Sequence, residues 1–323
     1  MFKRVLSLCL VLATVVCGGG GALASTPITI RLKGAFNEGM DSYYYLPQLI
    51  ESVYERSNGT VTVVWGAGPE AIPASELGEA MSAGIVEMVY VPMSFLASHA
   101  PGLLGTNLTD PAVMRENGGV EFMDSITRET VNSRFLARAQ NGSSFVLGVA
   151  EDVNSVADLQ GMIIRGTVSN RGIIVSVGAE MTSMPFADVR QALDRNVIQG
   201  AASTIRDFVD FSMGGIIKTL ILPGLFTSDA YLLIANHIWD RLDDVQKEAL
   251  MSSAIDWEVD SLRYNTRMHS ESVAILEAAG TRILELTGDE RDEYIRRAHA
   301  TAWEINEARD PETARKLREF TEN

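Results

Sequence analysis

Short apolar runs alternate with two helix-like segments between residues 156 and 205. The apolar runs cover residues 162–164, 180–184 and 197–202. Runs of this length, bounded by turn residues, are typical of buried strands, so the stretch predicts a βαβαβ unit. Its first strand is expected to end on a single cation, Arg165, which is followed by Gly166. This position makes Arg165 the first candidate for a binding residue.

The same pattern predicts strands and helices along the rest of the chain. Strands are expected at residues 29–33, 61–65, 86–91, 144–149, 216–222, 229–235 and 281–286. Pro223 and Gly224 are expected to form the turn after residue 222. Helices are expected from residue 41 or 42 to 57 and at 74–83, 107–139 (with polar breaks), 289–307 and 311–320.

One further segment, residues 238–279, contains no Gly or Pro and repeats apolar residues at helical spacing. A helix of nearly this length would be ~60 Å long at about 1.5 Å per residue. Because that length exceeds the width of a single lobe, we expect this helix to lie across two lobes.

Residues 73–81 and 185–193 match each other in character. Each segment begins with proline, carries an acidic residue three positions later and runs into a predicted strand. Chance similarity between two βα units is the alternative, but the match favours two similar lobes with a cleft between them. Ligands of open α/β sheets bind beyond the carboxyl ends of the strands. The loops expected at this cleft are residues 35–40, 66–72, 92–95, 165–170 and 203–206.

The first 24 residues predict a secretory signal peptide. Two cations precede an apolar run at residues 5–17, and residues 22–24 read Ala-Leu-Ala, so cleavage is expected after Ala24. Lipid attachment at Cys17 is the alternative, although the residues before it lack the pattern of a lipobox. Cys9 and Cys17 are the only cysteines, so the exported chain would have no thiol for a disulfide or a thiolate metal site.

Composition narrows the class of protein. The chain has 323 residues, of which 46% are hydrophobic, and this is enough for a sizeable core. Its formal charge of −15 argues against a nucleic-acid partner, because phosphate binding needs a basic surface. After residue 24 no apolar segment reaches the ~20 residues that span a bilayer. We therefore expect a soluble, exported protein.

The sequence carries no recognisable catalytic or metal-binding motif. His99, His237, His269 and His299 are not at ligand spacing, and there is no H-E-x-x-H, G-x-S-x-G or G-x-G-x-x-G pattern. We therefore expect a protein that is not an enzyme and that needs no metal or other cofactor.

Anion capture is the chemistry that remains. Arginine stays charged and offers a fixed fork of donors that meets a carboxylate at two points. The alternative for Arg165 is an ordinary surface arginine at a strand end. Ser203 and Thr204 end the partner strand, where they offer hydroxyl groups to a ligand or cap a helix beginning near Arg206. The tyrosines at 43–45 form either an aromatic wall or part of the core.

Two stretches resemble motifs of the solute-binding subunits of tripartite ATP-independent periplasmic (TRAP) transporters, the dicarboxylate-binding-protein-like family. Residues 158–165, DLQGMIIR, resemble a D-L-x-G-x-K-[IM]-R element. Residues 185–200 resemble a P-x-x-[ED]-V-Y-x-A-L-x-x-G-V-V-D-G element. The segments at residues 68–73 and 84–88 also resemble the sequences of one branch of this family. The resemblance spans nearly all of the chain after the signal peptide and rests on the order and spacing of these motifs.

The resemblance implies an α/β solute-binding fold of two lobes, with a cleft between the lobes and a long helix spanning both. Lobe I is expected to cover residues 25–150 with a returning segment at about 229–255. Lobe II is expected to cover residues 151–228 with C-terminal helices at about 256–323. The implied function is to capture a small organic acid in the periplasm and to deliver it to membrane permease subunits. The protein is expected to act as a monomer. A ligand-sensing module for a receptor is the alternative, and a secreted hydrolase or lyase is a more distant one.

In this family the arginine of the first motif forms a salt bridge to the ligand carboxylate, and the matching residue is Arg165. The other contacts expected at the cleft are Ser203, Glu70, Met93, Asn37, Arg206 and Tyr44. A second cation has no clear counterpart, and Arg171 or Arg206 would have to supply it. With one carboxylate anchor, a monocarboxylate with an aromatic or apolar body is favoured over a short dicarboxylate.

Overall fold

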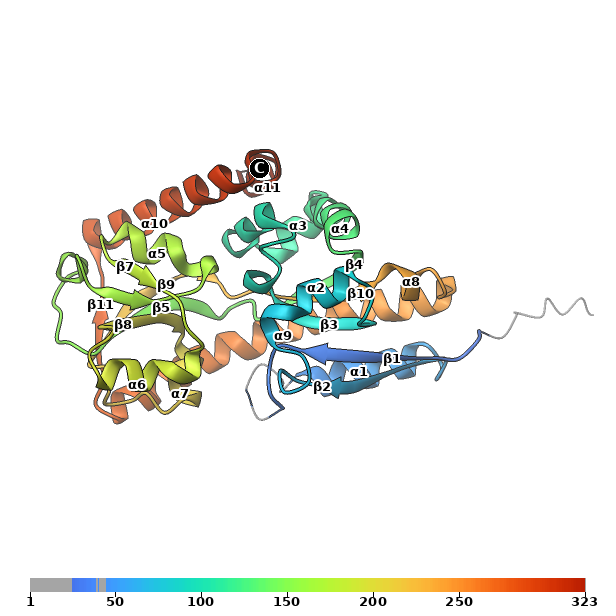
Figure 1. Cartoon of the computed structure of the whole chain (residues 1–323), viewed down its shortest axis with the longest axis horizontal. Helices are drawn as coiled ribbons and strands as arrows, with labels where there is room; N and C mark the ends of the chain where they lie inside the picture. The colour runs from blue at the N-terminus through green and yellow to red at the C-terminus, as the bar shows by residue number, and fades with distance from the viewer. Residues whose placement is uncertain (1–24, 39, 41–44, 323) are drawn as a thin grey trace, which may run out of the picture.

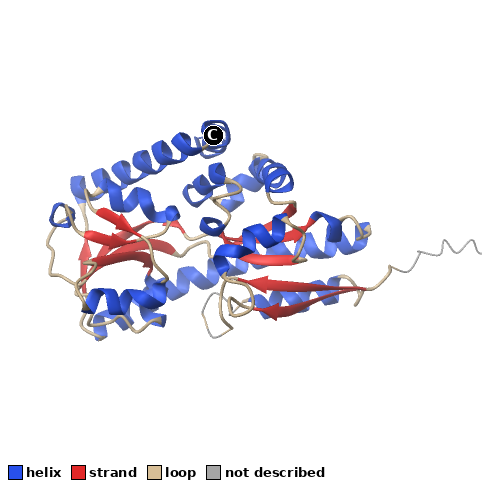
Figure 2. Cartoon of the chain, in the orientation of Figure 1, coloured by secondary structure: helices blue, strands red, loops and turns tan. Residues whose placement is uncertain are grey.

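Two mixed β-sheets, each covered by helices, form the two lobes of this computed structural model, which describes residues 25–38, 40 and 45–322 (Figure 1). The strands gather in two separate groups, and the helices lie around them (Figure 2). This architecture confirms the predicted α/β fold of two lobes.

The first sheet has the strand order β2-β1-β3-β10-β4. Its strands are β1 Ile28–Gly34, β2 Val61–Ala67, β3 Met88–Pro92, β4 Ser133–Ala139 and β10 Ala230–Ala235. β1 pairs in parallel with β2 and β3, whereas β10 is antiparallel to both β3 and β4. All of β10 and nearly all of β3 is buried, and this accounts for their continuous apolar sequences.

The second sheet has the strand order β11-β9-β5-β8-β6-β7. Its strands are β5 Ser144–Val149, β6 Ile163–Arg165, β7 Glu180–Thr182, β8 Gly200–Thr204, β9 Thr219–Thr227 and β11 Arg282–Glu285. β6 is parallel to β7 and β8, and β5 is antiparallel to β8 and β9. The predicted βαβαβ unit therefore lies at one side of this sheet.

The two sheets share one topology. The parallel set β2-β1-β3 corresponds to β7-β6-β8, and each set continues into an antiparallel strand, β10 or β5. Pro73 (φ −51°, ψ 139°) and Pro185 (φ −51°, ψ 140°) have nearly the same backbone conformation. Each proline precedes a three-residue 3₁₀ turn and a six-residue helix, α2 Leu77–Ser82 or α6 Val189–Asp194. This local match agrees with the predicted duplication.

Two short segments connect the sheets, a turn at residues 140–143 between β4 and β5 and residues 228–229 between β9 and β10. The sheets change at residues 140–143, earlier than the lobe boundary expected at 150, so β5 belongs to the second sheet. The expected turn at Pro223 is wrong, because β9 continues through Pro223 and Gly224. The register between β5 and β9 shifts opposite these residues, and such an irregularity accommodates a proline, which has no N–H to donate.

The segment 107–139, predicted to be helical, is helical only in its first part. A 3₁₀ helix at Pro101–Leu108, α3 Pro111–Glu116 and α4 Gly119–Thr130 are followed by β4. Six of the seven residues of β4 are buried, so both faces of the strand are covered and its sequence lacks the alternation that marks a half-buried strand. Pairing with β10, which comes about a hundred residues later in the chain, makes this segment a strand.

The predicted long helix spanning both lobes is confirmed. α9 Asp244–Ala278 has 35 residues, which corresponds to about 52 Å. It begins later than residue 238 because Asp243 caps it, accepting a hydrogen bond from the Gln246 N–H at 2.9 Å. A separate short helix, α8 Asn236–Trp239, comes before the cap. α9 contacts α1 Leu46–Arg56 and β4 in the first lobe and α7 Ile205–Asp210 in the second, as its orange ribbon in Figure 1 shows.

The last helices do not all stay with the second lobe, where they were expected. α10 Gly288–Arg309 packs against α5 Arg171–Ser176 of the second lobe. α11 Pro311–Glu322 packs against α3 and α4 of the first lobe. The C-terminal segment therefore bridges the two lobes on the side opposite α9 (Figure 1).

Candidate functional site

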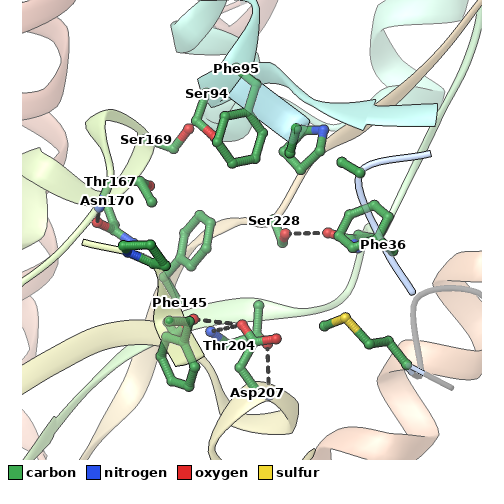
Figure 3. A pocket seen from close by; sticks show the side chains of 18 of the residues that line it. Phe36, Ser94, Phe95, Phe145, Thr167, Ser169, Asn170, Thr204, Asp207 and Ser228 are labelled. Carbon is green, nitrogen blue, oxygen red and sulfur yellow. Dashed lines mark hydrogen bonds between the residues drawn. The ribbon is translucent and has the colours of Figure 1, made fainter. Parts of the chain in front are cut away.

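A cavity of about 830 Å³ lies between the two lobes (Figure 3). All five loops predicted at the cleft contribute to its lining. They follow the carboxyl ends of the parallel strands β1, β2, β3, β6 and β8, as the rule for open α/β sheets requires. The two crossing segments also contribute, through Gln140, Ser143, Ser228 and Asp229, and α9 contributes Asn265.

Arg165 ends β6 and lies in this lining with only 7% of its surface exposed. Its Nε donates to the Met184 carbonyl at 2.9 Å and its Nη1 to the Ala202 carbonyl at 3.5 Å. The guanidinium stacks 5.2 Å from the centre of the Phe186 ring. Burial lowers the pKa of Arg165, and the charge of Asp207 opposes this shift. Arginine nevertheless remains charged at physiological pH.

Within the described part of the chain, Arg165 forms no ion pair with a carboxylate. A buried cation without a counter-ion is costly, and an anionic ligand would relieve that cost. Its surroundings hold it in place: the Ala202 carbonyl also accepts from Asn170 Nδ2 at 3.2 Å. Gly166 makes this arrangement possible, because a Cβ there would lie 2.6 Å from the Asn170 side chain and 2.4 Å from Ile174.

The start of α7 forms a second polar part of the cavity. Thr204 caps this helix and accepts a hydrogen bond from the Asp207 N–H at 3.2 Å. The Ser203 hydroxyl donates to Asp207 Oδ2 at 2.5 Å, and the Thr204 N–H donates to the same oxygen at 3.2 Å. Figure 3 shows Thr204 and Asp207 across the cavity from Ser94 and Phe95. The structure therefore shows the helix-cap role of Thr204, and because both residues line the cavity, their contact with a ligand stays a prediction.

Arg206 and Asp210 lie on the next part of the lining and neutralise each other. Arg206 Nε donates to Asp210 Oδ1 at 2.7 Å, at the i,i+4 spacing of α7. Arg206 was a candidate for a second cation. Its ion pair makes it a weaker partner for a ligand carboxylate than Arg165.

Asp229 lines the cavity and belongs to the segment that crosses from β9 to β10. Its Oδ2 accepts a hydrogen bond from Thr106 Oγ1 at 2.7 Å, and that hydroxyl also contacts Tyr231 at 2.6 Å. Burial raises the pKa of Asp229 to about 6, and the nearby charge of Arg138 opposes this shift. The carboxyl group is therefore expected to keep its proton to a higher pH than an exposed aspartate does.

We expect Asp229 to make the stability of the protein pH-dependent. The unfolded chain releases this proton near pH ~4, but the folded protein holds it up to about pH 6. Because the folded state binds more protons in this window, the free energy of unfolding should fall as the pH rises from ~4 to ~6. Asp229→Asn should remove that part of the pH dependence, measured by urea unfolding at several pH values. An unchanged slope in Asp229→Asn, compared with the exposed variant Asp240→Asn, would contradict this assignment.

The remaining lining is largely apolar. It contains the aromatic residues Phe36, Tyr45, Phe95, Phe145, Phe186 and Phe211. Tyr45 is buried against Trp257 and Tyr264, with ring centres 5.8 and 5.7 Å apart, so it belongs to the core and to the cavity wall. A ligand with an apolar body would fit this wall.

The structure brings together three of the residues expected to contact a ligand: Arg165, Ser203 and Arg206 line the cavity. Glu70, Met93 and Asn37 are not among its described lining residues. Glu70 accepts a hydrogen bond from the Gly68 N–H at 2.7 Å within its own loop. Met93 is fully buried in the core, and Asn37 is exposed. Tyr44, the seventh expected residue, lies outside the described residues.

Several polar residues of the lining were not named as site residues, among them Asp207, Asn170 and Gln140. For Asp207 a signal existed, because Thr204-x-x-Asp207 after a strand is the pattern of a capping box. Asn170 follows the same pattern with Thr167. Gln140 has a positive φ of 66°, which nothing in its local sequence indicates.

Within the described residues, no three His, Cys, Asp or Glu side chains cluster as they would around a metal ion. Across the same residues, no helix has the length and apolarity that crossing a membrane requires.

Comparison with known proteins identifies the class of protein that this fold and cavity represent. Residues 110–307 match the model of bacterial extracellular solute-binding protein, family 7. This match covers more than half of the chain, so the chain belongs to that family. It confirms the resemblance to TRAP transporter solute-binding proteins and places the protein outside the cytoplasm. Members of this family bind solutes, which is consistent with the expectation that the chain is not an enzyme.

Individual relatives are distant but extend along most of the chain. A monocarboxylate 2-oxoacid-binding periplasmic protein of Nostoc sp. is 22% identical over 269 residues, which are 79% of this chain and 72% of the relative. A TRAP periplasmic solute-binding protein from Desulfovibrio salexigens with bound orotic acid has a TM-score of 0.79 at 16% identity, covering 90% of this chain and 96% of that one. An extracytoplasmic solute receptor of Bordetella pertussis binding pyroglutamic acid has a TM-score of 0.76 at 14% identity, covering 92% and 100%.

Proposed function

We propose that this protein captures a small carboxylic acid between its lobes and holds the carboxylate on Arg165. The observation that carries the proposal is the buried Arg165 guanidinium, which lines the cavity and has no protein counter-ion among the described residues. A ligand carboxylate would supply the missing charge and accept two parallel hydrogen bonds. The similar proteins that bind a 2-oxoacid, orotic acid or pyroglutamic acid support this class of ligand.

The cavity also limits the size and character of the ligand. Its volume of about 830 Å³ falls in the range of pockets that enclose small molecules, ~300–1,000 Å³. Because most of the wall is apolar and aromatic, the body of the acid is expected to be apolar or to contain a ring. This supports a monocarboxylate over a short dicarboxylate.

Capture is expected to involve a change in the angle between the lobes. Ligand contacts from both lobes favour a closed state over an open one, since a ligand shifts the equilibrium toward the state that it binds more tightly. The closed protein would then deliver the acid to the permease subunits of a TRAP transporter in the membrane. We further propose that the chain is cleaved after Ala24 and acts as a monomer in the periplasm.

The identity of the acid can be tested directly. Small molecules that are released when the purified protein is denatured would be identified by mass spectrometry. Each candidate would then be added back to ligand-free protein and its effect on the melting temperature measured. We expect an organic acid that raises the melting temperature in a concentration-dependent way. Stabilisation only by molecules without an acidic group would contradict the proposal.

A further inference from the structure

The charged groups of the cavity are unusual for a site that binds an anion. Its described lining carries two arginines and three aspartates, so acids outnumber bases. Arg206 and Asp210 pair with each other, and Asp229 is buried and accepts a hydrogen bond from Thr106. This leaves Arg165 and Asp207 as the two opposite charges that face the ligand.

Asp207 is held by one oxygen and leaves the other available. Its Oδ2 accepts from the Ser203 hydroxyl at 2.5 Å and from the Thr204 N–H at 3.2 Å. Among the described residues, none donates a hydrogen bond to Asp207 Oδ1. A carboxylate oxygen can only accept, so this position suits a donor on the ligand.

The two groups are connected by consecutive residues of β8. Arg165 reaches the Ala202 carbonyl, and the next residue, Ser203, holds Asp207. The charge of Asp207 also favours the cationic form of Arg165, so the two groups interact electrostatically. They nevertheless form no direct ion pair within the described residues, so a ligand with complementary charges can lie between them.

We propose that Asp207 selects acids that carry an N–H donor close to the carboxylate, such as amino acids or their lactams. This inference rests on the proposed function, because it requires the ligand carboxylate to lie on Arg165. The ligand N–H would donate to Asp207 Oδ1. The carbonyl oxygen of a 2-oxo acid would instead face an acceptor, and the second carboxylate of a short dicarboxylate would face a like charge.

Matched pairs of acids provide the test. Calorimetry would compare alanine with pyruvate, leucine with 4-methyl-2-oxopentanoate, phenylalanine with phenylpyruvate, and proline with pyroglutamate, the last pair separating an ammonium from an amide N–H. In at least one pair of an amino and an oxo acid, the wild-type protein should bind the amino acid about tenfold or more tightly. This is the effect of one charge-assisted hydrogen bond. If the ligand is a lactam, pyroglutamate should bind more tightly than every oxo acid.

Asp207→Asn sharpens the test because it keeps the shape of the side chain. The asparagine oxygen can still accept from Ser203 and Thr204, while its NH₂ group replaces Oδ1 and donates instead of accepting. The preference should therefore shift toward the oxo acids by about tenfold or more. Asp194→Asn removes one charge from an exposed position on α6 of the same lobe and should leave the preference unchanged.

The outcomes separate this inference from the proposed function. Oxo acids that bind the wild-type protein as tightly as the N–H acids, or an unchanged preference in Asp207→Asn, would overturn the role of Asp207 alone. Failure of the wild-type protein to bind any carboxylic acid would overturn the proposed function. If Asp207→Asn does not fold, as judged by its melting curve, the wild-type preference within the pairs decides the question.

Discussion

Arg165→Ala is expected to lower the affinity for the acid by roughly 100-fold or more while leaving the fold intact. Removing one partner of a desolvated charge pair costs about 2–5 kcal/mol, and each 1.4 kcal/mol is about a tenfold change in affinity. The loss should appear in titration calorimetry with the acid that is released from the wild-type protein. Without ligand, the variant should melt at least as high as the wild type, because the uncompensated buried cation is gone.

Two further variants show whether this effect belongs to the guanidinium. Arg165→Lys keeps the charge but loses the planar fork and its contact with Phe186, so it should recover only part of the affinity. Arg195→Ala removes an exposed arginine outside the described lining and should bind like the wild type. Wild-type affinity in Arg165→Ala would show that the carboxylate binds elsewhere.

Among single substitutions that break one ion pair, Glu258→Ala is expected to lower the free energy of unfolding the most. Glu258 lies on α9 and is only 7% exposed at its side chain, while its partner Arg115 is 18% exposed. It accepts hydrogen bonds from Arg115 at 2.7 and 3.0 Å and from the backbone N–H of Arg138 at 2.7 Å. Breaking a buried ion pair by removing one partner costs about 3–5 kcal/mol, since the other charge stays buried.

The measurement is urea unfolding in the absence of ligand. Asp260→Ala is the matched control on the same helix. It breaks an ion pair with Arg263 in which the two side chains are 60% and 75% exposed, so the free energy of unfolding should change by less than about 0.5 kcal/mol. Equal effects of the two substitutions would show that Glu258 does not contribute through its buried ion pair.

Much of the fold could be predicted because its signals are local. The βαβαβ unit, the long helix and the duplicated segments after Pro73 and Pro185 all follow from periodicity and turn residues near in the sequence. β4 could not be predicted in this way, because it is covered on both faces and pairs with β10 across a long separation in the chain. The continuation of β9 through Pro223 also depends on its partner strand β5 rather than on its own residues.

For the site residues too, those with local sequence signals could be predicted and those that depend on tertiary contacts could not. Arg165 could be predicted, since it ends a strand next to glycine within a recognisable motif. Glu70 and Met93 were expected at the cleft only because their loops were. The structure shows that their side chains turn to their own loop or to the core. The side-chain direction within a loop depends on contacts that periodicity does not contain.

The position of β10 between β3 and β4 has a consequence for how the chain folds during synthesis and export. The first sheet cannot reach its five-stranded form until residues 230–235 are present, after the whole βαβαβ unit of the second lobe has been made. Contacts of such long sequence separation form slowly, because a large loop must close before they form. A fragment that ends at residue 142 would leave β3 and β4 without their shared neighbour, so the first lobe is not an independent folding unit.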